Sequence, residues 1–97
     1  MDLTSRRVSD PLLGPSYDHD VYAFTAGSVT IVARSYITQP EEAHFLRKEV
    51  QGEVRGLTEA DTGSTLFREA MAHLQKEGKA RLSYLSVTAG DYISLHV

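Results

Sequence analysis

The stretch that organises this chain runs from His19 to Ile37 and reads HDVYAFTAGSVTIVARSYI. Two segments rich in β-branched and aromatic residues, which favour strands, flank Thr25-Ala26-Gly27-Ser28. Because glycine readily adopts the positive φ of a tight turn, this sequence predicts a β-hairpin. The tripeptide Thr-Ala-Gly recurs at 88–90, again between two strand-like segments, so a second hairpin is predicted with its turn at these residues.

The register of each hairpin decides which side chains share a face of the sheet. A connection of two or four residues places Phe24 opposite Val29 and Tyr84 opposite Leu95. In the second hairpin a three-residue connection would instead pair Leu82 with His96, which mixes polar and apolar side chains on each face. We therefore predict an even-length connection in both hairpins. The resulting core face carries Tyr22, Phe24, Val29, Ile31, Leu82, Tyr84, Leu95 and Val97.

An amphipathic helix is predicted from Thr62 to Glu77. Its apolar residues recur at helical spacing and form one stripe. Gly78 follows at the position where glycine commonly ends a helix. The stripe consists of Leu66, Phe67, Ala70, Met71 and Leu74.

The segment from Thr38 to Leu57 is compatible with two structures. Pro40-Glu41-Glu42 resembles the first turn of a helix, where proline and acidic residues are favoured. A helix would, however, include Gly52 and Gly56, each costing about 1 kcal/mol relative to alanine. We favour the alternative, a β-hairpin with strands at Ala43–Val50 and Glu53–Leu57 and a turn at Gln51-Gly52.

Together these elements predict an α+β fold with two layers, in which one helix packs on one face of an antiparallel sheet. The sheet is expected to have four to six strands, in the order β-β-(β-β)-α-β-β. Residues 18–97 form this single domain. Residues 1–17 are expected to be a flexible N-terminal arm, because they lie at the terminus and contain Pro11, Gly14 and Pro15.

One helix covers one face of a sheet, so the second face needs its own explanation. In the predicted register that face is too apolar to be fully solvated, and we expect a homodimer to form through it. The edge of the C-terminal strand is a further surface for a protein partner. The predicted dimer interface consists of Val21, Val32, Leu85, Val87 and Tyr92.

Composition narrows the classes of function. The chain has 97 residues, no cysteine and a net charge of −3 at pH 7. It therefore forms no disulfide or thiolate metal site, and its charge argues against nucleic-acid binding by bulk electrostatics. No segment approaches the roughly 20 apolar residues of a membrane span. We expect a small cytoplasmic protein of bacterial type, with no metal, cofactor, nucleic acid or membrane as partner.

No catalytic motif is found, so a binding role is expected ahead of an enzymatic one and no catalytic residue is predicted. The residues around His44, including Glu41 and Glu42, are interpreted as a charged surface turn. The predicted function is an interaction or regulatory module that acts as a homodimer.

The alternative is a small-molecule-binding protein or small enzyme with a pocket on the sheet face. Some small acid-binding pockets are built from histidine, tyrosine and arginine side chains on one concave sheet face. In the predicted register such side chains come from both hairpins. The candidate ligand-binding residues are Arg34, Tyr36, Tyr92 and His96.

Overall fold

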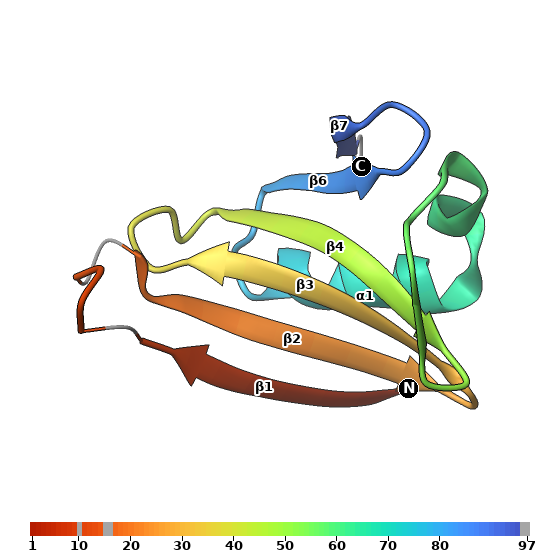
Figure 1. Cartoon of the computed structure of the whole chain (residues 1–97), viewed down its shortest axis with the longest axis horizontal. Helices are drawn as coiled ribbons and strands as arrows, with labels where there is room; N and C mark the ends of the chain where they lie inside the picture. Colours follow the sequence, from red (N-terminus) through yellow and green to blue (C-terminus); the bar gives the residue numbers. More distant parts are fainter. Residues whose placement is uncertain (10, 15–16, 96–97) are drawn as a thin grey trace.

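The computed structural model describes residues 1–9, 11–14 and 17–95, and within them the chain has seven strands and one α-helix. The fold is α+β (Figure 1). The strands are β1 (Asp2–Val8), β2 (His19–Ala26), β3 (Val29–Tyr36), β4 (Glu42–Val50), β5 (Glu53–Arg55), β6 (Arg81–Ser86) and β7 (Asp91–Leu95). The 3-10 helix η2 (Glu59–Gly63) and the helix α1 (Thr65–Lys76) lie between β5 and β6.

The strands form one sheet in the order β1-β2-β3-β4-β6-β7, and β5 pairs with β4. Because β3 occupies one edge of β4, β5 and β6 share the other edge: β5 pairs with Lys48–Val50 and β6 with Glu42–Phe45. The pairing of β4 with β6 is parallel, whereas the other strand pairs are antiparallel. The parallel pair brings residues about 40 positions apart in the chain side by side.

Both Thr-Ala-Gly turns have connections of even length, as predicted. Two residues, Gly27 and Ser28, join β2 to β3, and four residues, 87–90, join β6 to β7. Gly27 has φ 60° and Gly90 has φ 68°, the left-handed conformation that favours glycine. The local sequence therefore predicts the two hairpins for the correct physical reason.

The individual pairs in both hairpins differ from the prediction by two residues. Phe24 lies opposite Ile31 instead of Val29, and Tyr84 lies opposite Ile93 instead of Leu95. Side chains alternate between faces with a period of two, so this displacement leaves every side chain on its predicted face. The predicted core residue Val97 lies outside the described residues.

The segment from Thr38 to Leu57 contains the predicted β-hairpin and not a helix. Strands β4 and β5 pair around Gln51 and Gly52. The return strand is shorter than predicted, because after Arg55 the chain leaves β4. Leu57 then forms a bridge with Ser86 next to β6.

The predicted helix is confirmed, although it begins three residues later than Thr62. The preceding residues form η2, in which the Asp61 carboxylate accepts hydrogen bonds from the backbone N–H and the hydroxyl of Thr58. The Ser64 hydroxyl then accepts a hydrogen bond from the backbone N–H of Phe67 and caps α1. Several competing cap residues in a row explain why the sequence alone places the start too early.

The N-terminal segment contributes the strand β1, which is not predicted from the sequence. It pairs with β2 from Asp2 opposite Thr25 to Val8 opposite His19. Apart from Leu3 and Val8 its side chains are polar, so it lacks the apolar alternation that signals a strand. The flexibility of residues 1–17 stays a prediction.

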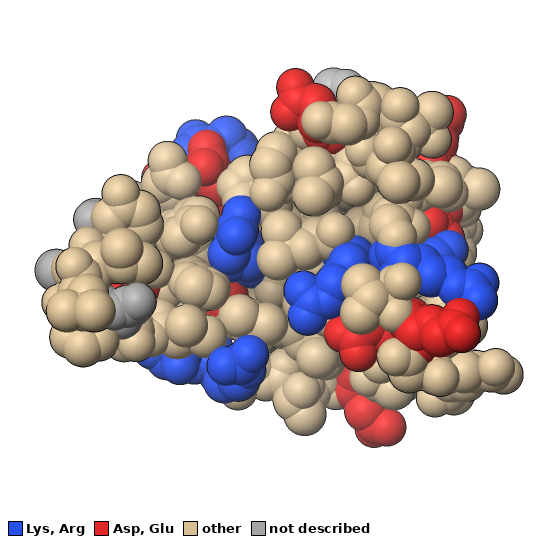
Figure 2. Space-filling view, viewed as in Figure 1, with Lys and Arg blue, Asp and Glu red and all other residues tan. Residues whose placement is uncertain are grey.

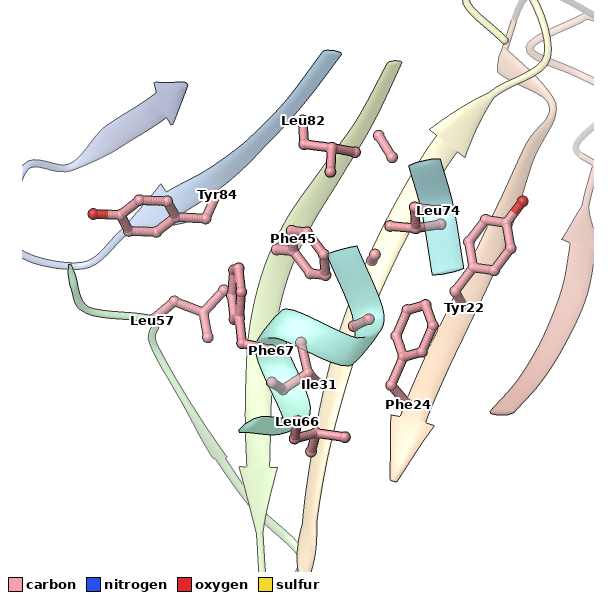
Figure 3. Close-up of a cluster of buried hydrophobic side chains, with 13 residues drawn as sticks. Tyr22, Phe24, Ile31, Phe45, Leu57, Leu66, Phe67, Leu74, Leu82 and Tyr84 are labelled. Carbon is pink, nitrogen blue, oxygen red and sulfur yellow. The ribbon is translucent and has the colours of Figure 1, made fainter. Parts of the chain in front are cut away.

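The core lies between the sheet and α1 (Figure 3). The rings of Phe45 on β4 and Phe67 on α1 lie 4.4 Å apart at its centre. Of the predicted core residues, Val29 and Leu95 are partly buried at its margin. The buried cluster consists of Tyr22, Phe24, Ile31, Ala33, Ala43, Phe45, Leu57, Leu66, Phe67, Ala70, Leu74, Leu82 and Tyr84.

Candidate functional site

The face of the sheet opposite α1, here called the open face, carries a polar cluster that crosses four neighbouring strands. Arg34 comes from β3, His44 from β4, Ser83 from β6 and Tyr92 from β7. The register places Arg34 opposite His44 and His44 opposite Ser83. Each position alternates along its strand with residues of the helix-covered core, so the pattern that builds the core also aligns this cluster.

The four side chains form one connected network. The Tyr92 ring lies against the His44 imidazole, with ring centroids 5.0 Å apart. Nη2 of Arg34 donates a hydrogen bond of 3.2 Å to the Tyr92 hydroxyl, and Nδ1 of His44 lies 2.6 Å from Oγ of Ser83. Because the Tyr92 oxygen accepts from Arg34, its own O–H remains able to donate to a ligand.

Arg34 is a half-buried cation without a counterion among the described residues. Its guanidinium lies over the Tyr36 ring, 4.8 Å from the centroid. No described carboxylate lies within 4.0 Å of it. Its Nε is buried and has no hydrogen-bond partner in the described part of the chain. Removing a charged donor from water without a partner is unfavourable, which makes Arg34 the least satisfied group of the cluster.

The electrostatics of the cluster favour a neutral His44. Burial lowers the pKa of His44, the positive charge of Arg34 lowers it further, and Glu42 acts in the opposite direction. A neutral imidazole has one donor and one acceptor nitrogen. At neutral pH His44 therefore completes the hydrogen-bond network with Ser83 without adding a second positive charge beside Arg34.

A pocket of about 240 Å³ opens beside Tyr92. At one end Arg81 pairs with Glu42, with 3.0 Å between Nε and Oε1, so this arginine already has a carboxylate partner. Two serines, Ser83 and Ser94, line this pocket together with Tyr92. The residues that line the pocket are Glu42, His44, Arg81, Leu82, Ser83, Tyr92 and Ser94.

Three of the four predicted ligand-binding residues lie together in the structure. Arg34 contacts both Tyr36 and Tyr92, whereas His96 lies outside the described residues. His44 and Ser83 are missed by the sequence interpretation, which treats the surroundings of His44 as a surface turn. The missed signal is strand alternation, which places the side chain of residue 44 on the open face once Ala43–Val50 is a strand.

The five residues predicted to form a dimer interface have very different exposures. Val32 is 3% exposed, so its own chain already covers it. Val21 and Leu85 are partly buried, whereas Val87, in the β6–β7 connection, and Tyr92 on β7 are exposed. In Figure 1 α1 lies behind the sheet, so Figure 2 shows the open face, where basic side chains lie in separate groups among mostly uncharged surface. The homodimer through this face stays a prediction.

No protein-family model, curated protein or solved structure matches this chain. Within residues 1–9, 11–14 and 17–95, no group of three or more histidine, aspartate or glutamate side chains is placed to hold a metal ion. No helix of this described part is long and apolar enough to cross a membrane. The function is therefore argued from the geometry of the site alone.

Proposed function

We propose that the protein binds a small molecule with a carboxylate group on the open face, at the cluster of Arg34, His44, Ser83 and Tyr92. The observation that carries this proposal is the half-buried Arg34 guanidinium, which has no carboxylate partner among the described residues. An anionic ligand offsets the unfavourable burial of this charge. A carboxylate is the anion whose planar shape best complements a guanidinium.

Hydroxyl donors between Arg34 and the pocket supply the rest of the recognition. The Arg34 guanidinium donates to the Tyr92 oxygen, which strengthens the Tyr92 O–H as a donor toward a ligand. Ser94 adds a further hydroxyl group to the lining of the pocket, whereas the Ser83 hydroxyl is already hydrogen-bonded to Nδ1 of His44. Pockets for drug-sized ligands have volumes of roughly 300–1,000 Å³. The 240 Å³ pocket therefore suits a smaller acid, with an apolar or aromatic part that packs on Tyr92.

The geometry favours binding over nucleophilic catalysis. His44 and Ser83 are hydrogen-bonded, but among the described residues no carboxylate or carbonyl is hydrogen-bonded to Nε2 of His44. A base in a nucleophilic site is normally oriented by such a third group. The cluster therefore has the donors of a carboxylate site without the full constellation of a hydrolase.

The test is a titration followed by two-dimensional NMR, with acetate and benzoate as probes and acetamide and benzamide as their neutral counterparts. We expect the carboxylates to shift backbone signals of β3, β4, β6 and β7 around the cluster, and the amides to leave them in place. Arg34→Met should weaken carboxylate binding at least about tenfold, or about 1.4 kcal/mol.

The matched control is Arg47→Met. Arg47 is also an open-face arginine, but it has an acidic partner in Glu49, at 3.4 Å. This variant should bind carboxylates as the parent does. Equal losses in the two variants, or equal shifts from acids and amides, would reject Arg34 as the anchor of the site.

A further inference from the structure

The two outer edges of the sheet are protected very differently. The edge strand β1 carries Arg6 and Arg7, and Arg7 is ion-paired with Asp20. Charged side chains of this kind prevent an edge strand from pairing with another chain. The opposite edge, β7, has no basic residue and exposes large apolar side chains on both of its faces, because Tyr92 is 41% exposed and Ile93 38% exposed. The edge at β7 is thus open to pairing.

We propose that β7 pairs with β7 of a second copy of this chain, antiparallel and centred on Ile93. Two identical strands related by a two-fold axis are self-complementary. This register places the two Ile93 side chains opposite each other on the helix-covered side of the sheet. On the open face it places Tyr92 opposite Ser94 of the partner subunit.

A second β7 is the occupant that fits both exposed side chains. Tyr92 and Ile93 point to opposite faces of the sheet, so one covering helix or loop would bury one of them and leave the other exposed. A strand added at the edge flanks both faces and also pairs the outward backbone groups of β7. Two copies of β7 can pair in this way without placing like charges opposite each other, because the charged residue of the strand, Asp91, lies at its end.

The dimer would also complete the pocket on the open face. Tyr92 and Ser94 are the pocket residues contributed by β7, so the pocket reaches the edge of the sheet. In the proposed register Tyr92 of the partner subunit lies beside Ser94 and adds an aromatic wall there. Dimerisation itself does not depend on the proposed ligand, whereas this wall rests on the proposed function.

A pair of five-residue strands buries little surface, so the dimer should be weak. Interfaces below about 1,200 Å² are typical of transient complexes. Sedimentation velocity over a range from low to high micromolar concentration should therefore show a reversible monomer–dimer equilibrium. A chain that sediments as a monomer at every concentration would overturn the proposal and leave β7 available to a segment of another protein.

Cross-linking tests the register, because the chain contains no cysteine that could interfere. Directly opposed residues of an antiparallel pair have Cβ atoms about 4.5–5.5 Å apart, which is close enough for a disulfide after small adjustments. Ile93→Cys should form a disulfide-linked dimer under mild oxidation. Val54→Cys is the control, since Val54 is 66% exposed on β5, which pairs with β4 and not with β7. Equal cross-linking of both variants would indicate random collision and reject the register.

A charge at the same position tests the interface without a covalent bond. Ile93→Lys should give a monomer at all concentrations, because it would place two ammonium groups opposite each other. Val54→Lys should dimerise as the parent does, and circular dichroism checks that both variants are folded. A dimer that survives Ile93→Lys would place the interface elsewhere. A dimer that forms normally but binds no carboxylate would reject the proposed function alone.

Discussion

The two faces of the sheet are built from alternate residues of the same strands, yet they obey opposite physical rules. On β4, Phe45 is fully buried beneath α1, whereas the adjacent His44 lies in the hydrogen-bonded cluster of the open face. The covered face is stabilised by the close packing of buried apolar side chains, and polar contacts do not replace this packing. The polar cluster on the open face is held by charge and hydrogen-bond geometry, which contribute little to stability but can recognise a ligand. Substitutions on the two faces should therefore separate stability from binding.

The largest expected effect is that of Phe45→Ala. Truncating a fully buried phenylalanine removes its contacts, including those with Phe67, and leaves a cavity. We expect a loss of about 3–5 kcal/mol in the free energy of unfolding, measured by urea denaturation. His44→Ala on the same strand should lose about 1 kcal/mol, since it removes one hydrogen bond to Ser83. Similar losses in the two variants would contradict the division between the faces.

The alternation of apolar and polar residues predicts on which face of the sheet a side chain lies. It does not predict which residues of β4 and β6 become neighbours in the parallel pair. Arg34 and Tyr92 are identified because the even length of the hairpin connections is enough to place them on the open face. His44 and Ser83 become partners through the parallel contact of β4 with β6, and this contact joins residues 39 positions apart with no local signal. The sequence also does not determine the exact residue pairs of the first hairpin, because the residues around Gly27 allow a two-residue connection at either of two positions. Tertiary packing makes that choice.

The second prediction concerns the rim of the covered face, where Lys48 on β4 meets Asp61 of η2. The two groups are 2.7 Å apart and their side chains are 23% and 18% exposed. Because Asp61 also accepts hydrogen bonds from Thr58, Asp61→Asn should lose about 1–2 kcal/mol of stability at pH 7. The exposed pair of Arg55 with Glu53 is the control, and Glu53→Gln should change stability by less than about 0.5 kcal/mol.

The contribution of the contact between Lys48 and Asp61 to stability should decrease as the pH falls. Burial opposes the ionisation of Asp61, but Lys48 and the hydrogen bonds from Thr58 outweigh it and lower the pKa of Asp61. An aspartate whose pKa is lower in the folded state contributes stability above its ordinary pKa of about 4, and that stability is lost as the pH falls below this value. Urea midpoints at pH 6 and pH 3 should differ less in Asp61→Asn than in the parent. An equal difference would contradict this role.

The smallest expected effect is the titration of His44 on the open face, in a higher pH window. Its pKa is lowered by burial and by Arg34, so the unfolded chain binds a proton before the folded chain does. The contribution of His44 to stability is therefore complete above its ordinary pKa of about 6.5 and declines as the pH falls from there toward the lowered pKa. Urea midpoints at pH 7.5 and pH 5.5 should differ less in His44→Gln than in the parent.

The cause of the His44 shift can be separated with the variant that tests ligand binding. Arg34→Met removes the second cause and leaves burial, so its stability should depend on pH less than in the parent but more than in His44→Gln. Arg47→Met should match the parent, because Arg47 is paired with Glu49. A dependence in Arg34→Met that equals or exceeds that of the parent would mean that Arg34 does not repel the protonated imidazole. The intermediate result, together with the loss of carboxylate binding in the same variant, would show that one guanidinium both lowers the pKa of His44 and anchors the anion.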